Sequence, residues 1–353
     1  MAIETENSND LSAFNFEKEI ERWTEFTNAI MGPELSANHT PRKPIWKKNK
    51  ATLWHYAPVE KKYEIPIFMI YSLFNTPSIL DFAPGSSVIE GLVNNGYDVY
   101  LLDWGIARHE DKDINIEDYI SDYIQKGVKR TLRHSKADEV SLIGYCLGGT
   151  FAAMYAAIAE EPIRNLIVAT VPIDFSVSAL PDKWEEALKG DGFNVDRLIE
   201  LYGVIPPSYV ESMFRSVTSP IYNSPYVTLL ARANDKRFVE KWKRMNKWNS
   251  GHVPLTGGAF RQLTIDLFKE NKLVKGEFTI HGQKVDLGKI KENLLVVSSK
   301  NDTLIPEGQS LPLMDLVSSK DKTYLRVEAG HVSLAMTGKL NGILNDWLGE
   351  HSS

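Results

Sequence analysis

The stretch SLIGYCLGGTFAAMYAA, Ser141–Ala157, joins an apolar strand to an alanine-rich helix. At the junction, Gly144, Gly148 and Gly149 flank Cys146, which is the only cysteine in the chain. Small neighbours let a residue in such a tight turn project its side chain above the sheet, as a nucleophile elbow requires. Lone cysteines are often buried and inert, but the three glycines favour a nucleophile here. The stretch therefore predicts a strand–elbow–helix unit with Cys146 as the nucleophile.

On both sides of this unit, strands and helices alternate. We expect strands at 51–56, 65–73, 97–104, 139–144, 163–175, 293–302 and 323–331, and helices at 86–96, 115–135, 150–161 and 341–350. Apolar strands alternating with helices predict an α/β fold, with a mostly parallel sheet covered on both faces. The alternation stops over 176–290, which we expect to form an inserted, mainly helical cap. The core then comprises 46–175 and 291–353, and 1–45 is an N-terminal extension.

The N-terminal extension contains apolar residues at helical spacing, which are Phe16, Ile20, Trp23, Phe26 and Ile30. They predict an amphipathic helix, which either packs on the rest of the chain or docks a partner. The basic, proline-containing segment 38–50 follows, and we expect it to be a solvated linker.

The helix after Cys146 aims its N-terminal N–H groups at the sulfur, and this favours the thiolate. The backbone N–H of Leu147 is then available to stabilise an oxyanion. A second oxyanion donor is expected in the loop after the strand at 65–73, near Leu73–Asn75, with Leu73 as the first candidate.

A cysteine nucleophile needs a base, and the base needs a carboxylate to orient it. In folds with a nucleophile elbow, the chain order is nucleophile, acid, histidine. His331 follows a strand and a glycine in EAGHVSL, so it is the expected base. The other histidines after the elbow are less suitable, because His252 and His281 lie in the cap or its exit and His351 lies in the tail.

Three aspartates at strand ends are candidates for the acid. Asp302, in SSKNDTLIP, follows the strand at 294–299 and is the first choice, because Thr303–Pro306 and the turn at the strand end resemble an acid loop. Asp174, in VPIDF, is the alternative and could instead support the start of the cap. Asp103, in LLDWG, precedes the nucleophile and is expected to be structural or to form a pocket wall.

Composition excludes several other classes of function. The net charge is −6, which argues against a general nucleic-acid binder. One cysteine excludes an intramolecular disulfide and a cysteine-based zinc site, and no residue cluster calls for a metal. No Walker loop or GxGxxG motif supports nucleotide hydrolysis or hydride transfer. The N-terminus has no signal-peptide pattern, and no apolar run reaches the roughly 18 residues of a membrane span, so we expect a cytoplasmic protein.

Several blocks in order along the chain resemble the catalytic subunits of polyhydroxyalkanoate (PHA) synthases. Besides the elbow, they are residues 71–105, 118–124, 162–175, 271–302 and 329–334, and the resemblance runs from about Trp46 to the C-terminus. GYCLGG alone is also similar to the motif of dienelactone hydrolases, which carry a cysteine nucleophile too. Those enzymes are much shorter, however, and have no room for the long stretch between Cys146 and Asp302.

The resemblance implies an α/β-hydrolase fold with a cap over the active site. It implies that Cys146 is acylated, that His331 is the general base, and that Asp302 orients His331 or helps to activate the incoming hydroxyl. The implied substrate is an (R)-3-hydroxyacyl-CoA, first of all 3-hydroxybutyryl-CoA, and the implied products are a polyester and free CoA. The CoA thioester is thus a substrate, and no cofactor is expected.

The resemblance also implies partners. Only about 45 residues precede the core, as in the short synthase subclasses that act with a second subunit, and GYCLGG with LLDWG is similar to the Bacillus type, whose partner is a small regulatory subunit. A homodimer of the catalytic subunit and a location at the surface of cytoplasmic PHA granules follow from the same resemblance. The alternatives are a cysteine hydrolase of the dienelactone hydrolase or thioesterase type, and a non-catalytic granule protein with a decayed site.

Overall fold

The computed structural model describes residues 16–33, 35, 39–178, 182–190, 193–218 and 224–352. The chain forms two compact units. The larger comprises Ala37–Ser219 and Trp248–Ser353, and the smaller comprises Met1–Ser36 and Pro220–Lys247. The predicted division into extension, core and cap stays a prediction, and the two units have other boundaries.

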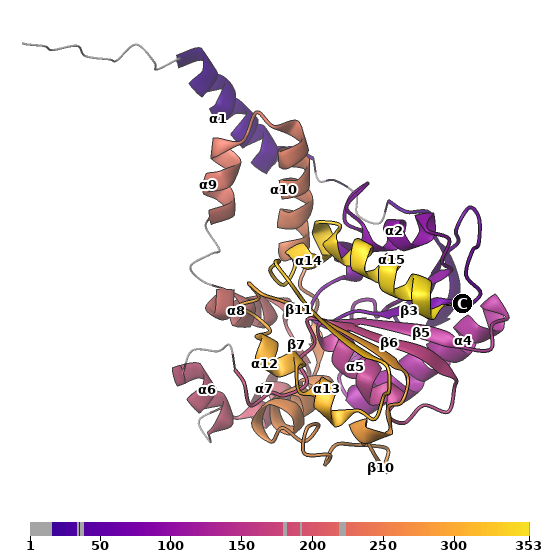
Figure 1. The fold of residues 1–353 in the computed structure, drawn as a ribbon. Helices are drawn as coiled ribbons and strands as arrows, with labels where there is room; N and C mark the ends of the chain where they lie inside the picture. The colour runs from indigo at the N-terminus through magenta and orange to yellow at the C-terminus, as the bar shows by residue number, and fades with distance from the viewer. Residues whose placement is uncertain are drawn as a thin grey trace, which may run out of the picture. The chain divides into compact units, whose positions relative to one another are not determined.

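An eight-stranded sheet forms the centre of the larger unit (Figure 1), in the order β1-β2-β4-β3-β5-β6-β11-β12. Its strands are β1 (Lys43–Lys48), β2 (Ala51–Tyr56), β3 (Ile67–Ile70), β4 (Val99–Asp103), β5 (Val140–Tyr145), β6 (Ile163–Ala169), β11 (Asn293–Ser299) and β12 (Lys322–Val327). Only the β1–β2 and β2–β4 pairs are antiparallel. The predicted mostly parallel sheet is therefore confirmed, and the carboxyl ends of its parallel strands share one edge.

Helices cover both faces of this sheet. Figure 1 shows α2 (Val88–Asn94) and α15 (Lys339–His351) packed together on one face, with α4 (Lys126–Ser135) and α5 (Leu147–Ala156) on the other. Every residue of α5 is buried, because the helix lies between the sheet and the π-helix η3 (Tyr119–Gln125). The shorter elements of this core are η1 (Pro77–Asp81), η2 (His109–Asp111), α3 (Ile116–Asp118), α12 (Glu307–Ser310), α13 (Leu313–Leu316) and α14 (Ser333–Met336).

The segment 176–290 is mainly helical where it is described, as predicted. Its helices are α6 (Asp182–Lys189), α7 (Val195–Tyr202), α8 (Pro207–Thr218), α9 (Ser224–Ala231), α10 (Lys236–Asn249), α11 (Gly257–Gln262), the π-helix η5 (Leu263–Lys269) and η6 (Leu287–Lys289). Two short antiparallel ribbons pair β7 (Val204–Ile205) with β8 (Leu255–Thr256), and β9 (Thr279–Ile280) with β10 (Gln283–Lys284).

The smaller unit contains α1 (Phe16–Met31), α9 and most of α10. Its core is formed by Ala29, Leu229 and Trp242, and Phe26 packs against them. The predicted N-terminal helix is thus present, but most of its apolar stripe is not buried in this structure. Phe16, Ile20, Trp23 and Ile30 are between 46% and 67% exposed.

The prediction that 38–50 is a solvated linker is wrong, because Lys43–Lys48 forms the edge strand β1 and pairs with β2. Lysines and a proline are tolerated on an edge strand, where they discourage pairing with other chains. The basic composition of the segment is therefore the reason why the sequence did not predict this strand. The guanidinium of Arg42 also lies 4.0 Å from the Trp54 ring centroid, which fixes the entry to β1.

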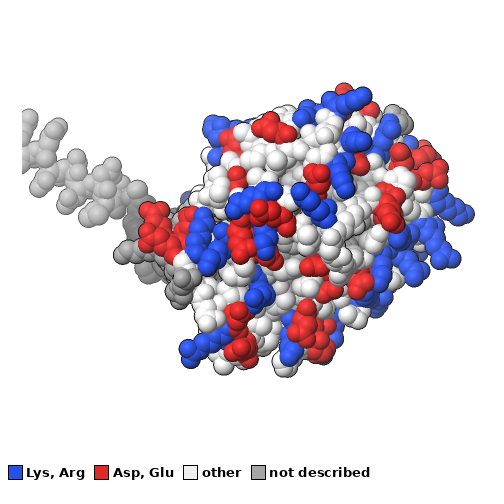
Figure 2. Space-filling model, turned by 90° about the horizontal axis from the view of Figure 1, so that it is seen from below, with Lys and Arg blue, Asp and Glu red and all other residues white. Residues whose placement is uncertain are grey.

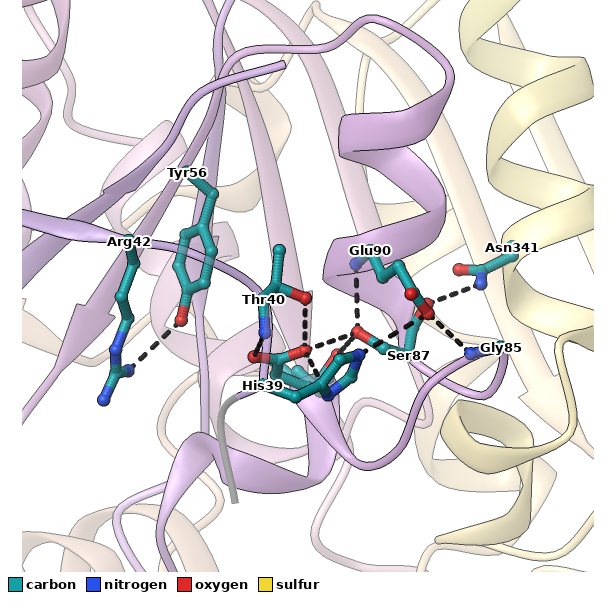
Figure 3. A network of polar contacts seen from close by, with 10 residues as sticks. His39, Thr40, Arg42, Tyr56, Gly85, Ser87, Glu90 and Asn341 are labelled. Carbon is teal, nitrogen blue, oxygen red and sulfur yellow. Dashed lines mark hydrogen bonds and ion pairs between the residues drawn. The ribbon is translucent and has the colours of Figure 1, made fainter. Parts of the chain in front are cut away.

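A buried polar network ties the start of the larger unit to α2 (Figure 3). Asp81, fully buried, accepts hydrogen bonds from the Thr40 N–H at 3.1 Å, the Thr40 hydroxyl at 2.7 Å and the Ser87 hydroxyl at 2.8 Å. The Ser87 hydroxyl in turn accepts the Glu90 N–H at 2.9 Å and caps α2. Hydrogen bonds to Asp81 therefore fasten the chain just before β1.

Charges of both signs are mixed on the face shown in Figure 2. Ion pairs among the described residues include Lys300 with Glu328 and Lys48 with Asp122.

Candidate active site

Cys146 lies in the turn between β5 and α5, as the elbow motif predicts. Its backbone has φ 54° and ψ −131°, which is an uncommon conformation for a residue with a side chain. The turn is held by a hydrogen bond from the Cys146 N–H to the Ala169 carbonyl at 2.9 Å, and by one from the Gly149 N–H to the Cys146 carbonyl at 2.8 Å. The residue is only 5% exposed. The strained turn therefore presents a shielded thiol at the carboxyl edge of the sheet.

The elbow needs glycine at two positions because backbones approach there. A Cβ at Gly144 would lie 2.4 Å from the Gly149 Cα, and one at Gly148 would lie 2.3 Å from the Ile70 carbonyl oxygen. Real Cβ contacts are essentially never under 3.0 Å. The start of α5 is thus pressed against the ends of both β5 and β3.

His331 and Asp302 meet at the same edge, in the loops after β12 and β11. The His331 Nδ1 lies 2.8 Å from Asp302 Oδ2. The other carboxylate oxygen, Oδ1, accepts the N–H groups of Leu304 at 2.9 Å and Ile305 at 2.8 Å. These two bonds hold the carboxylate, so that Oδ2 is presented to the imidazole.

The His331 ring is coupled to Cys146 as well as to Asp302, and this coupling shifts its pKa. Burial lowers this pKa, but the charges of Cys146 and Asp302, together with the hydrogen bonds that the ring donates to both, raise it to about 10. An imidazolium between a sulfur and a carboxylate is the arrangement that a cysteine nucleophile needs. The structure therefore brings together Cys146, His331 and Asp302, which the sequence places far apart.

Tyr145 is a further residue of this site, which the sequence analysis missed. Its hydroxyl donates a hydrogen bond to the His331 carbonyl, and the two rings meet edge to face with centroids 5.9 Å apart. Burial, and then the charges of Asp302 and Cys146, raise the pKa of Tyr145 well above its usual value. A tyrosine in an apolar strand is typical of a core residue, so nothing in the sequence singles it out.

The other candidate acids bond elsewhere. Asp174 accepts the Ser176 N–H at 2.9 Å and the Asn271 amide at 2.8 Å, which links the loop after β6 to the end of η5. Although burial raises its pKa, the hydrogen bonds from the Ser176 hydroxyl and N–H and from Asn271 hold the pKa of Asp174 below its usual value. Asp103 accepts the Trp54 indole N–H at 3.3 Å and the Gly105 N–H at 3.1 Å, in agreement with a structural role.

The other three histidines after the elbow also have different partners. His252 forms a β-bridge with Asn75, the His281 N–H bonds the Glu117 carboxylate, and the ring of His351 stacks on Trp347.

The two expected oxyanion residues flank the elbow. Leu147 is the first residue of α5, and Leu73 lies in the loop after β3, whose start contacts Gly148. Both are nearly buried, at 2% and 4% exposure. Their roles as donors stay predictions.

Two searches of the described residues gave negative results. None of these residues form a group of three or more His, Cys, Asp or Glu side chains that could hold a metal ion. Every helix in the described ranges is also too short or too polar to cross a membrane.

Comparisons with known proteins show which family the sequence resembles. Residues 66–335 match the family described as alpha/beta hydrolase fold. The chain is 32% identical over 327 residues to a poly(3-hydroxyalkanoate) polymerase subunit PhaC of Haloferax mediterranei, covering 90% of this chain and 66% of that protein. It is 30% identical over 331 residues to the PhaC subunit of Allochromatium vinosum, covering 92% of each.

Solved structures show the same fold at low sequence identity. The crystal structure of a monoacylglycerol lipase from Paleococcus ferrophilus aligns with a TM-score of 0.50 and 16% identity, covering 85% of this chain and 99% of the lipase. At this identity the likeness concerns the fold alone.

Proposed function

Because the chain belongs to the family of poly(3-hydroxyalkanoate) polymerase PhaC subunits, built on an α/β-hydrolase fold, we propose that it polymerises 3-hydroxyacyl units through a thioester on Cys146. The enzyme is an acyltransferase, its substrate is an (R)-3-hydroxyacyl-CoA, first of all 3-hydroxybutyryl-CoA, and CoA is released. The observation that carries the proposal is the position of the His331 ring between Cys146 and Asp302.

In the first step, the Cys146 thiolate attacks the thioester carbonyl of the substrate, and a new carbon–sulfur bond forms. The Leu147 N–H and a donor near Leu73 stabilise the oxyanion. The carbon–sulfur bond to CoA then breaks, and the His331 imidazolium gives its proton to the leaving CoA thiolate. A thioester is exchanged for a thioester, so the step is nearly balanced in free energy.

In the second step, the hydroxyl of another 3-hydroxyacyl unit attacks the acyl group on Cys146. His331 takes the proton of this hydroxyl, an ester bond forms, and the Cys146 thiolate is released. An acylated sulfur carries no charge, so one cause of the raised His331 pKa disappears. The pKa of His331 then falls, and the neutral ring can act as the base. Asp302 keeps Nδ1 protonated, so that the other ring nitrogen faces the hydroxyl.

The proposal extends to partners and location. We propose that a small regulatory subunit acts with this chain, that the chain forms a homodimer, and that both work at the surface of cytoplasmic PHA granules. The exposed apolar side chains of α1, Phe16, Ile20 and Trp23, support a docking role for that helix. The proposed chemistry uses only groups of the protein and the CoA substrate, so it calls for no cofactor. Copurification of the full chain with the subunits produced by its host tests the partner.

The proposed reaction is tested with (R)-3-hydroxybutyryl-CoA, with free CoA and turbidity followed in parallel. We expect both signals with the wild type and neither with Cys146→Ala. Retention of CoA release by Cys146→Ala would refute the covalent scheme. CoA release by the wild type without any polymer would instead identify a hydrolase of the dienelactone hydrolase or thioesterase type.

A further inference from the structure

A cavity of about 300 Å³ lies in the larger unit, beside the loop that follows β3. Four segments form most of its walls: the β1–β2 turn, the loop from Leu73 to Pro77, the end of β4 with the loop after it from Asp103 to Ala107, and residues 253–255 at the start of β8. Asp111, Ile114, and Tyr119 and Tyr123 of the π-helix η3 complete the lining. π-helical segments are rare and occur often at functional sites.

This cavity and His331 lie on opposite sides of Cys146. In the sheet order β4-β3-β5-β6-β11-β12, the nucleophile follows β5, whereas Asp302 and His331 follow β11 and β12. The cavity borders the ends of β3 and β4. It is tied to the elbow, because the Trp104 indole in its wall donates to the Tyr71 carbonyl at 3.0 Å, and Gly148 at the start of α5 packs against the Ile70–Tyr71 backbone.

The lining combines apolar walls with few polar groups. Leu73, Ile106, Val253 and Leu255 supply hydrocarbon, and Trp104 and Tyr119 supply aromatic faces. The charged residues of the lining are already engaged: Lys50 pairs with Glu110, Asp103 accepts two N–H groups, and Asp111 accepts the Arg108 N–H. No lining cation is therefore left for the phosphates of CoA. The volume is at the lower limit of small-molecule pockets, about 300–1,000 Å³, and suits a short, weakly polar chain.

We propose that this cavity binds the first repeats of the growing polyester while the chain is attached to Cys146. The inference rests on the proposed function and names a binding site for its product. The strand order places the cavity on the side of β5 away from β11 and β12, so a chain there leaves the His331 side free for the incoming hydroxyl. The acyl group of the incoming monomer is the second possible source of the same chemistry.

The outer wall of the cavity is fastened to the loop after β3. The Val253 N–H donates to the Phe74 carbonyl at 3.2 Å, and the Trp248 indole donates to the Thr76 carbonyl at 3.0 Å. The Asn75 amide donates back to the Trp248 carbonyl at 2.9 Å. The cavity is therefore preformed, and binding there requires no ordering of the wall. A chain held there keeps its new thioester near Cys146 after each addition, which favours repeated addition over release.

Two variants test the cavity by filling it. Val253→Trp narrows it from the wall, and Ile106→Trp narrows it from the rim, where Ile106 is 59% exposed and a larger side chain leaves the core undisturbed. Val59→Trp, at a fully exposed position outside the cavity, is the matched control. With (R)-3-hydroxybutyryl-CoA, rapid mixing measures the first burst of CoA, steady-state assays measure elongation, and mass spectrometry measures chain length.

We expect the ratio of the elongation rate to the burst rate to fall about tenfold in both cavity variants, because pockets discriminate by size at this level. Product chains should become shorter in proportion, and the control should match the wild type. Chains of wild-type length from a folded Ile106→Trp protein would overturn the proposal. Equal losses of burst and elongation would also overturn it, and would place the monomer acyl group in the cavity. A wild type that releases no CoA would refute the proposed function instead.

Discussion

Gly148→Ala provides a sharp test of how the elbow is built. Gly148 has helical backbone angles, so glycine is required there by space and not by conformational freedom. An added Cβ would lie 2.3 Å from the Ile70 oxygen, 2.7 Å from the Ile70 carbonyl carbon and 2.8 Å from the Tyr71 carbonyl carbon. All three are backbone atoms, which cannot rotate away. Ordinary contact begins at 3.4 Å, so α5 and the end of β3 must separate by about 1 Å.

This displacement affects activity more than stability. Overpacking costs about 1–3 kcal/mol, but alanine in a helix recovers about 1 kcal/mol relative to glycine. The free energy of unfolding should therefore fall by about 0–2 kcal/mol. A shift of about 1 Å between Cys146 and the loop that carries Leu73 should lower kcat about 100-fold, since catalysis depends on such positioning.

Gly342→Ala is the matched control. Gly342 lies within α15, and a Cβ there would meet nothing within 4 Å. This variant should gain up to about 1 kcal/mol of stability and keep full activity. Urea unfolding measures stability, and CoA release from (R)-3-hydroxybutyryl-CoA measures kcat. A Gly148→Ala protein with kcat within about twofold of the wild type would refute the reasoning.

Three further predictions concern the acid, the base and the residue that positions it. Asp302→Asn should lower kcat about 100- to 10,000-fold. Asp174→Asn should keep kcat within about twofold and lose only about 1 kcal/mol of stability. If Asp174→Asn instead showed the larger loss of CoA release, Asp174 would be the acid. The pKa of His331 is raised from 6.5 to about 10, so its stabilising contribution is complete below pH 6.5 and is lost as the pH rises to 10. Cys146→Ser removes one cause of that shift, so its unfolding midpoint in urea should fall less over this pH range than that of the wild type, and equal falls would contradict the pairing. Tyr145→Phe keeps the ring but leaves the His331 carbonyl without its donor, so kcat should fall about tenfold with KM unchanged; a change in KM alone would contradict a positioning role.

The sequence sufficed to predict the parts of the site that local rules determine. The glycines around Cys146 specify the elbow, since only they fit the backbone contacts found there. The order of strands along the chain places Asp302 and His331 at the same edge, because parallel strands end on one side of a sheet.

Features that depend on tertiary contacts could not be predicted in this way. The strand β1 has the charge of a linker, and only its pairing with β2 makes it part of the sheet. Tyr145 resembles a core residue until the loop with His331 packs against it. The cavity needs four distant segments to meet, and the π-helical turn at Tyr119–Gln125 that lines it has no local sequence signal that separates it from an α-helix.

Because the chain has a single cysteine, the rate of thiol modification reports directly on access to the active site. Cys146 is the only thiol and is 5% exposed, so a thiol reagent can modify it only when the surrounding structure opens. The rate of modification in the native protein, divided by the rate in urea after both are corrected for the thiolate fraction, gives the population of the open state, with each tenfold of protection worth about 1.4 kcal/mol. A series of reagents of increasing size would convert that population into the width of the opening. Because no second thiol contributes to the signal, the energetics of entry can be measured without a substrate and without altering the chain.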